Sequence, residues 1–451
     1  MPLKSVHITN YYHKNSGGIS TSFNNLMAAA ERHERYVRLI VPGETESVED
    51  VNEYAKIYYV YARQSPVIDK RYRVMMPWQY MAKDSIIRKI LLAERPDFIE
   101  VTDKYTLSMF GAMVRINKFN ELGRPMLVHF SCERMDDNVA SFLTTGRMGK
   151  WLARRIISNY TMPSFDYHIA NSTYTAEEFY ESLSQEKNPG RNEGFLNWSW
   201  RFFKAPRVRV NERIFVCPRG VDSVHFTPDR TSDDIRREML AASGIPEDAV
   251  ILLYAGRLSP EKNIELLVDL MKILAADDDQ DYRLLVAGDG PQSNWLKQQG
   301  EKYASGKIVQ LGHLEKETLA DYYANADVFV HPNPKEPFGI APLEAMASGV
   351  ATVAPNAGGI LSYATNENAW LVEPTGERFA EAIREVVENS SLRESKIAKA
   401  LETARANTRE ASTDRLFATY DNIYEDFQNR KDLFTDIAKA REFDFVERLL
   451  T

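Results

Sequence analysis

The sequence predicts an α/β protein made of two doubly wound domains. Its 451 residues exceed what one hydrophobic core normally organises and suit two domains of about 200 residues each. Short buried strand patterns alternate with helical patterns in both halves, which is typical of parallel sheets covered by helices. Glycine or proline follows most of the strand patterns, as expected where a strand turns into a helix.

In the N-terminal half, a strand pattern at residues 6–9 leads into a turn with Gly17 and Gly18 and then into a helical pattern. Glycines after a first strand are typical both of a plain turn and of a phosphate-binding loop, and their spacing alone does not separate the two. Further strands are expected at residues 37–41, 98–101, 126–130 and 167–170.

The C-terminal half repeats this organisation. Its strands are expected at residues 214–217, 250–254, 282–287, 307–311, 328–330 and 351–354. Proline and glycine at residues 218–220 mark the hinge, so we place the first domain at residues 1–215 and the second at 216–411.

Charge and composition exclude several classes of protein. A net charge of −8 argues against a surface built to bind nucleic acid. The two cysteines, Cys132 and Cys217, are too few for a disulfide framework and lack zinc-site spacing. Neither a signal peptide nor a membrane-spanning run is found, so a cytoplasmic protein is expected.

Residues 185–213 form a basic, aromatic stretch in this acidic chain. Two interpretations stay open: a surface loop with incidental charges, or a site that meets anionic lipid headgroups at the inner face of a membrane. Residues 150–157, which combine Trp151 with two arginines, add some weight to the second.

Two cations follow the strand at residues 250–254. Arg257 and Lys262 flank the start of a helix, where the helix dipole normally favours acidic residues. An anionic ligand would resolve that conflict, and so would surface salt bridges to Glu261 or Glu265.

A proline-rich loop follows the strand at residues 328–330. Glu336 lies on the loop, and Glu344 lies within the next helix. Backbone N–H groups at Phe338, Gly339 and Ile340 would point into the same crevice, because helix starts leave such groups unpaired. Carboxylates can accept hydrogen bonds from vicinal sugar hydroxyls.

Taken together, four segments resemble the GT-B superfamily of glycosyltransferases, specifically the retaining family 4 type (glycosyl transferases group 1). They are GRLSPEKN at residues 256–263, LLVAGDGP at 284–291, VQLGHL at 309–314, and the spacing of Glu336 and Glu344. The resemblance implies two Rossmann-like domains facing a central cleft.

The resemblance also implies roles for individual residues. Arg257 and Lys262 match the pair that grips the donor diphosphate, Glu336 the carboxylate beside the donor sugar, and Glu344 the carboxylate on the ribose. The remaining donor-binding positions implied are Gly17, Gly18, Gly256, Gly288, His313, Leu314, Phe338, Gly339 and Ile340.

In the first domain, the resemblance implies a strand that ends in a catalytic histidine, His129, beside the reacting sugar. We look for the acceptor site at Asp103, Lys104, Tyr105 and Arg134. A helix at about residues 412–428 resembles the family's closing segment, which crosses back to the first domain. The tail, residues 431–451, is expected to be a terminal helix packed on the surface or on a partner.

The implied function is a retaining, metal-independent transfer of a hexose from a UDP- or GDP-linked sugar to a hydroxyl of a glycan, glycolipid or small acceptor. No cofactor or metal is expected besides the donor, and the oligomeric state stays open. The alternatives are a GT-B-fold nucleotide-sugar epimerase or phosphorylase, and a non-catalytic nucleotide-sugar binding subunit. An NAD-dependent oxidoreductase is disfavoured, because neither half has G-x-G-x-x-G after its first strand.

Overall fold

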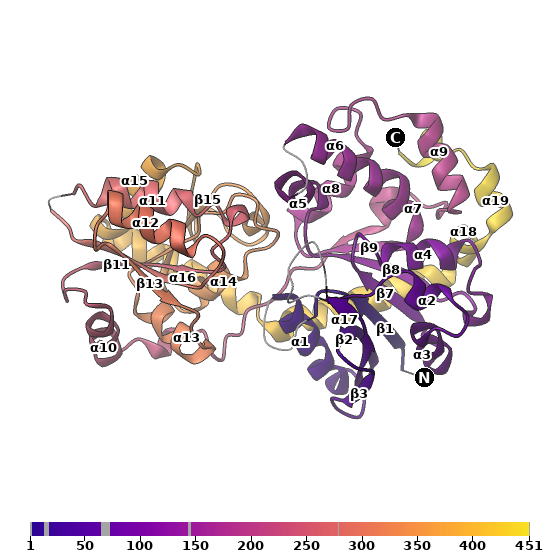
Figure 1. The fold of residues 1–451 in the computed structure, drawn as a ribbon, viewed down its shortest axis with the longest axis horizontal. Helices are drawn as coiled ribbons and strands as arrows, with labels where there is room; N and C mark the ends of the chain where they lie inside the picture. The colour runs from indigo at the N-terminus through magenta and orange to yellow at the C-terminus, as the bar shows by residue number, and fades with distance from the viewer. Residues whose placement is uncertain (1, 13–17, 65–72, 143–145, 278, 451) are drawn as a thin grey trace. The chain divides into compact units, whose positions relative to one another are not determined.

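The chain divides into two compact units (Figure 1). The computed structural model describes residues 2–450 except 13–17, 65–72, 143–145 and 278. Unit 1 comprises Met1–Pro218 and Ser412–Thr451, and unit 2 comprises Arg219–Ala411. The chain therefore passes between the units twice, and the division lies three residues after the boundary expected from the sequence.

Unit 1 is built on an eight-stranded sheet with the order β10-β9-β8-β7-β1-β2-β4-β3. Neighbouring strands are parallel except β3 and β4. The bounds are β1 Lys4–Thr9, β2 Tyr36–Gly43, β3 Ser47–Asp50, β4 Ala55–Tyr61, β7 Phe98–Thr102, β8 Met126–Ser131, β9 Tyr167–Ala170 and β10 Ile214–Val216; β5 Arg63–Gln64 and β6 Arg73–Val74 form a separate pair.

Helices cover both faces of this sheet. Successive side chains of a strand point to opposite faces, so Leu39 of β2 packs in one apolar cluster and Ile40 in the other. The helices are α1 Gly18–Arg32, α2 Trp78–Met81, α3 Ile86–Glu94, α4 Ser108–Arg115, α5 Met135–Phe142, α6 Arg147–Ile156, α7 Met162–Ser164, α8 Thr173–Leu183, α9 Glu193–Phe202, α17 Arg409–Asn429, α18 Lys431–Thr435, α19 Ile437–Glu442 and α20 Phe445–Leu449.

The long helix α17 completes the core of unit 1. Phe417, Tyr420 and Ile423 are buried in the cluster that contains Leu39, together with Phe23 of α1. These residues recur every three or four positions, the spacing at which side chains share one face of a helix. The segment that enters last along the chain therefore covers the first strands of the sheet.

Unit 2 is a six-stranded parallel sheet with the order β13-β12-β11-β14-β15-β16. Its strands are β11 Val250–Ala255, β12 Tyr282–Ala287, β13 Ile308–Gly312, β14 Val328–Val330, β15 Ala351–Pro355 and β16 Trp370–Val372. Its helices are α10 Asp233–Ser243, α11 Glu265–Leu274, α12 Ser293–Tyr303, α13 Lys316–Asn325, α14 Ile340–Ala347, α15 Gly376–Glu388 and α16 Ser390–Ala406.

One strand was assigned to the wrong half of the chain. The sequence analysis counted residues 214–217 among the strands of the C-terminal half, across the expected boundary, but β10 pairs with β9 in the sheet of unit 1, Ile214 opposite His168. The short strands β3 and β16 and the seven-residue strand β4 were not expected. In the described ranges, no helix is both long and apolar enough to cross a bilayer.

Candidate functional site

The strand order of unit 2 creates a switch point between β11 and β14. The chain leaves β11 towards β12 on one side and leaves β14 towards β15 on the other. In open parallel sheets, ligands bind beyond the carboxyl ends of the strands at such a point. Arg257 and Lys262 follow β11, and the loop with Glu336 follows β14, so two segments far apart in sequence meet at this position.

Lys262 and Glu336 form the central ion pair of this site. The Lys262 Nζ lies 2.7 Å from Glu336 Oε2 and 3.0 Å from Oε1. The Asn333 side-chain amide donates to Glu336 Oε2 at 2.9 Å, and the Asn263 amide donates to the Pro332 carbonyl at 2.9 Å. The start of α11 and the loop after β14 are therefore fastened together.

The surroundings keep Glu336 ionised. Burial raises the pKa of its carboxyl, but Lys262, His331 and Asn333 outweigh this and lower the pKa to about 2. Burial lowers the pKa of His331 to about 4, so this imidazole is neutral near pH 7. Because an ammonium group has three N–H donors and the Lys262 side chain is partly exposed, it can bind an anion as well as Glu336.

Arg257 lies at the same strand end. It is exposed, and its carbonyl accepts a hydrogen bond of 3.0 Å from the Tyr254 hydroxyl. This bond fixes the backbone of the loop that carries Arg257.

The start of α14 presents backbone N–H groups beside the ion pair. Phe338 is buried against Tyr363, with ring centroids 5.2 Å apart. Gly339 takes a left-handed conformation, with φ at 85°, and its carbonyl accepts a hydrogen bond from the Tyr363 hydroxyl. Ile340 begins the helix, whose first turn leaves N–H groups available to a ligand.

A pair of glycines that the sequence analysis did not single out supports this loop. The Gly359 N–H donates to the Glu336 carbonyl at 2.7 Å. A Cβ at Gly359 would lie 2.0 Å from the Pro337 carbonyl oxygen, so only glycine fits. The signal in the sequence was the Gly358-Gly359 dipeptide directly after β15.

Glu344 is set apart from Glu336 by its environment. It is half-buried and receives a hydrogen bond of 3.3 Å from the Tyr323 hydroxyl. Burial raises its pKa to about 7, against the smaller opposing effects of Tyr323, Arg409 and Lys316. The two carboxylates, eight positions apart in the sequence, therefore differ in charge near neutral pH.

Glycines at three neighbouring strand ends bring the backbone close together. A Cβ at Gly288, after β12, would lie 1.9 Å from the carbonyl oxygen of Gly256, which follows β11. The Gly288 N–H donates to the Gly312 carbonyl at 2.7 Å. His313 is exposed next to Gly312, and Leu314 packs against the core. This edge is thus free of Cβ atoms where a ligand would approach.

Unit 1 has a corresponding switch point between β1 and β7. Asn10, after β1, donates to Asp103, after β7, at 3.0 Å, and the backbone N–H groups of Tyr105 and Leu107 also bind Asp103. Burial raises the pKa of Asp103 to about 6. Gly18 begins α1 and is exposed, whereas Gly17 lies outside the described residues.

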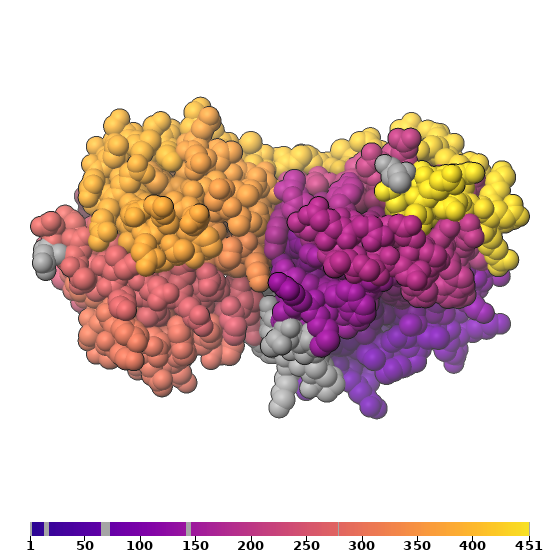
Figure 2. All heavy atoms as spheres, turned by 90° about the horizontal axis from the view of Figure 1, so that it is seen from above, coloured from indigo at the N-terminus to yellow at the C-terminus, as the bar shows by residue number. Residues whose placement is uncertain are grey.

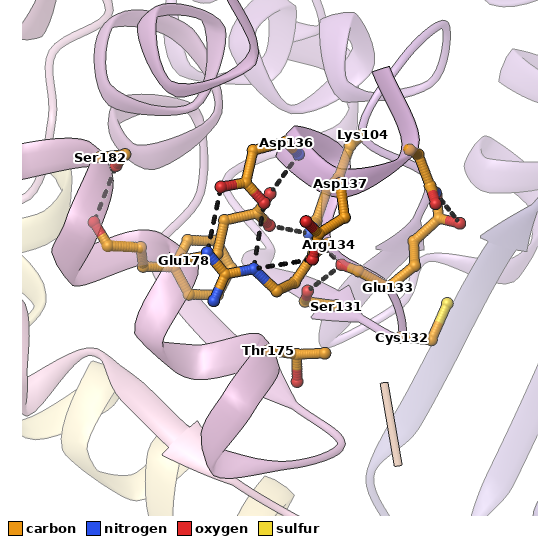
Figure 3. A network of polar contacts seen from close by, with 12 residues as sticks. Lys104, Ser131, Cys132, Glu133, Arg134, Asp136, Asp137, Thr175, Glu178 and Ser182 are labelled. Carbon is orange, nitrogen blue, oxygen red and sulfur yellow. Dashed lines mark hydrogen bonds and ion pairs between the residues drawn. The ribbon is translucent and has the colours of Figure 1, made fainter. Parts of the chain in front are cut away.

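The other two acceptor candidates lie in a buried ion network (Figure 3). Lys104 pairs with Glu178 and with the Glu133 carbonyl. Arg134 pairs with Asp136, at 3.0 Å, and with Glu181. Both cations are almost wholly buried, so this arrangement ties α5 to α8 rather than offering free donors at the surface.

His129 lies within β8, close to its carboxyl end. It is the fourth of six residues of this strand, and its ring is fully buried between Phe165 and Phe179. Burial, together with His168, lowers its pKa well below 6.5. The imidazole is therefore neutral and enclosed by aromatic side chains in this structure, and the catalytic role implied for His129 stays a prediction.

Glu133 lies just beyond the end of β8. Its carboxylate accepts hydrogen bonds from the Tyr11 hydroxyl at 3.1 Å and from the Asn138 amide at 2.7 Å, and it stays half-buried. Sequence reasoning had noted the Cys132–Asp137 segment but had not selected Glu133. Its place two residues beyond β8 was the available signal.

Comparison with known proteins agrees with the geometry of unit 2. Residues 235–403 match the family described as glycosyl transferases group 1. A GDP-mannose-dependent alpha-(1-6)-phosphatidylinositol dimannoside mannosyltransferase of Mycobacterium tuberculosis is 26% identical over 389 residues, covering 85% of this chain and 88% of the relative. Residues 235–403, which make up most of unit 2, are therefore similar to the group 1 glycosyltransferases.

Other relatives support this assignment. A D-inositol 3-phosphate glycosyltransferase of Geodermatophilus obscurus is 36% identical over 220 residues, which cover 46% of this chain and 47% of the relative. Among solved structures, sucrose-phosphate synthase from Thermosynechococcus elongatus has a TM-score of 0.67 at 18% identity, covering 94% and 99% of the two chains. Anabaena Alr3699/HepE in complex with UDP and glucose has a TM-score of 0.65 at 16% identity, covering 93% and 100%.

Proposed function

We propose that this glycosyltransferase moves a hexosyl group from a nucleotide diphosphate sugar to a hydroxyl of a glycan, glycolipid or small acceptor, with retention of anomeric configuration. The observation that carries the proposal is the cationic strand end of unit 2, where Lys262 pairs with Glu336 and Arg257 is exposed beside them. Unit 1 would supply the acceptor site, and unit 2 the donor site.

The proposed reaction separates charge, and the cations of the unit 2 site would stabilise the negative charge that forms. As the glycosidic bond to phosphate breaks, negative charge grows on the departing nucleoside diphosphate. Arg257, Lys262 and the N–H groups at Phe338, Gly339 and Ile340 would stabilise it, and such preplaced groups are often the largest contribution to catalysis. Glu336, ionised near neutral pH, would lie against the donor sugar.

The remaining donor contacts follow the same logic. Glu344 would bind the ribose hydroxyls, because a carboxyl group with a pKa of about 7 can both accept and donate hydrogen bonds near neutral pH. The strand ends at Gly256, Gly288, His313 and Leu314 would contact the nucleoside.

Among the donors, GDP-mannose is the one to test first. Several relatives are named GDP-mannose-dependent mannosyltransferases, including one of Mycolicibacterium smegmatis that is 39% identical over 147 residues, 33% of this chain and 35% of the relative. UDP-linked hexoses remain the second choice.

We also infer that transfer is independent of a divalent metal, because Arg257 and Lys262 can balance the diphosphate charge. Asp277, Asp279 and Asp281 precede β12 and so lie at the amino end of that strand, at the end opposite the candidate site. Asp277 pairs there with Arg384, and Asp281 pairs with Arg283 and Lys307. A reducing compartment such as the cytoplasm is inferred from the free thiols of Cys132 and Cys217.

The test combines binding and turnover. GDP, UDP and ADP with their sugars are screened by the shift in unfolding temperature, and we expect one base to stand out. Transfer from the preferred donor is then measured with EDTA, and the anomeric configuration of the product is read by NMR. Loss of activity in EDTA that Mg²⁺ restores would overturn metal independence, and an inverted product would overturn retention.

A further inference from the structure

Helix α9 carries an exposed aromatic ladder. Phe195, Trp198 and Phe202 recur at helical spacing on one face and stack with ring centroids 5.5 Å apart at each step. All three are more than half exposed, although Trp200 of the same helix is fully buried. Exposed aromatic residues in such a row are costly in water and are typical of a surface that meets a partner.

Helix α6 exposes a second apolar strip. Met148, Trp151 and Leu152 are 45–65% exposed, and the helix contains four basic residues and no acidic ones. The Arg155 guanidinium lies over the Trp151 ring at 5.2 Å from its centroid. The helix therefore places apolar and cationic groups together at the surface.

The two helices are joined through the loop between α8 and α9. Arg154 donates to the Lys187 carbonyl, and Arg155 donates to the Pro189 carbonyl at 3.4 Å. The Trp200 indole N–H donates at 2.8 Å to the Ser158 carbonyl, in the π-helical turn that continues α6. Figure 1 shows both helices on the upper side of unit 1, and Figure 2 views that side from above.

The C-terminal tail holds α9 from its inner side. Phe445 is buried against Trp200, and its N–H binds the Asn197 side chain at 3.1 Å. Arg201 donates to the Phe443 carbonyl at 2.9 Å. In Figure 2 the yellow tail borders the magenta surface of this region. The tail therefore covers the inner side of α9, and within the described residues the aromatic ladder stays more than half exposed.

The charge of this region differs from that of the whole protein. Residues 147–156 and 184–209 contain ten Lys or Arg and two acidic residues, Glu186 and Glu193, in a chain with a net charge of −8. Some cations serve the fold, since Lys150 pairs with Asp137 and Arg191 with Glu193. Arg147, Lys187 and Arg209 are exposed.

We propose that the outer faces of α6 and α9, the α6–α9 face, bind the surface of an anionic lipid bilayer. Aromatic rings beside cations suit the headgroup boundary, where the rings enter the apolar edge and the cations meet phosphate. The face differs from the whole 185–213 stretch considered from the sequence, because Trp200 and Arg213 are buried in the unit. The lipid surface would bring a lipid-linked or membrane-bound acceptor to the enzyme.

The direct test is flotation of the full chain with phosphatidylcholine vesicles and with vesicles that also contain phosphatidylglycerol. We expect binding to the anionic vesicles, weakened by salt. The combined variant Trp151→Ala, Trp198→Ala and Phe202→Ala should bind at least about tenfold more weakly, because three interfacial rings are lost. Arg147→Glu with Lys187→Glu should weaken binding by about tenfold or more.

Matched controls lie elsewhere on unit 1. Trp78 of α2 is 64% exposed, and Lys89 of α3 is exposed, so Trp78→Ala and Lys89→Glu remove the same kinds of group. Both should bind vesicles within about twofold of the unchanged chain. Unfolding temperatures measured for every variant separate a lost surface from a lost fold.

Three results would overturn the proposal: no binding to anionic vesicles, equal loss in the Trp78→Ala control, or a dimer in solution that the triple variant dissociates. The last would assign the face to a second copy of the chain. Transfer to a short soluble acceptor should be unaffected in the triple variant. Vesicle binding is measured without donor or turnover, so its failure is distinguishable from failure of the proposed transfer reaction.

Discussion

In the proposed reaction the Lys262 ammonium group binds both the Glu336 carboxylate and the donor diphosphate. Lys262→Ala or Arg257→Ala should lower transfer by about a hundredfold or more, because each removes a charge that faces the departing group. Steady-state kinetics with the preferred donor would measure this. Lys297→Ala, which removes an exposed lysine of α12, is the matched control. Unchanged turnover in both site variants would refute the donor assignment.

Glu344 gives the enzyme a stability that depends on pH. Its pKa is about 7 in the folded chain against 4.5 for an ordinary glutamate, so the folded state holds this proton more tightly. Its contribution is complete below about pH 4.5 and is lost as pH rises towards 7. Glu344→Gln, which stays neutral, should therefore gain up to about 3 kcal/mol relative to the unchanged chain between these limits.

Chemical unfolding at pH 4.5, 6 and 8 would measure the Glu344 effect. Glu381→Gln is the control, since that glutamate lies on the surface of α15 and pairs only with exposed Arg378. A difference between Glu344→Gln and the unchanged chain that does not grow with pH would contradict the shifted pKa.

Site residues were predictable where several residues in a fixed spacing resembled the family. Lys262 and Glu336 come from such segments, and in the structure their charged groups lie 2.7 Å apart. His129 came from the resemblance to the family, and its catalytic role stays a prediction. The strand was expected to end at residue 130, and β8 ends at Ser131, so Glu133 follows the strand at the sheet edge.

The loop after β14 depends on a backbone contact that admits no side chain. Gly359→Ala would place a Cβ 2.0 Å from the Pro337 carbonyl oxygen, so the loop that carries Glu336 must shift. We expect a loss of about 2 kcal/mol or more in stability, and weaker donor binding by calorimetry.

Gly194→Ala is the control for that substitution. Gly194 lies inside α9, and an added Cβ would meet only the Asn192 side chain, at 3.4 Å. Because alanine favours helix more than glycine, we expect a gain of about 0.5–1 kcal/mol. Equal effects at the two glycines would mean that the Pro337 contact is not what holds the loop.

The elements were predictable in proportion to their length and burial. The central strand β11 was clear in the sequence because it is a continuous apolar run between turns, and β7 and β12 are each interrupted by one charged residue, Glu100 and Arg283. The edge strand β3 is polar, and the edge strand β16 is only partly buried, whereas β14, equally short, is fully buried and was predicted. The seven-residue strand β4 was missed because its buried and partly buried residues do not form a continuous apolar run. The partner of β10 was misassigned because three apolar residues do not specify which sheet they join.

At the scale of the whole molecule, unit 1 depends on the last segment of the chain. Phe434 and Phe445 of the tail are buried in unit 1, and the Leu433 carbonyl accepts a hydrogen bond of 2.9 Å from the Arg207 N–H. A chain that ends after α17 should unfold at a lower temperature, because losing even one buried phenylalanine costs about 3–5 kcal/mol.

Hydrogen exchange would locate that loss. Amides of α9 and β9 should exchange faster in the shortened chain, while those of β11 and β12 should be unchanged. A chain shortened by only its last two residues is the control. Equal acceleration in both units would contradict the assignment of the tail to unit 1 alone.

The alternation of strands and helices was sufficient to predict two α/β domains. The segments of unit 2 at residues 256–263, 284–291 and 309–314 pointed to the family. The discontinuous composition of unit 1 was less accessible, since packing of a distant helix on a sheet is set by tertiary contacts. Its prediction came from the resemblance of residues 412–428 to the family's closing segment and from the apolar stripe of α17.

Because unit 1 is made of two separate segments, its parts are synthesised at different times. When residue 218 has left the ribosome, the sheet of unit 1 still lacks Phe417, Tyr420 and Ile423 on one face. Unit 2 is contiguous and can finish folding as soon as it emerges. Residues 1–218 therefore keep an apolar face uncovered until α17 has been synthesised. This makes them the part of the nascent chain where we expect a chaperone to bind.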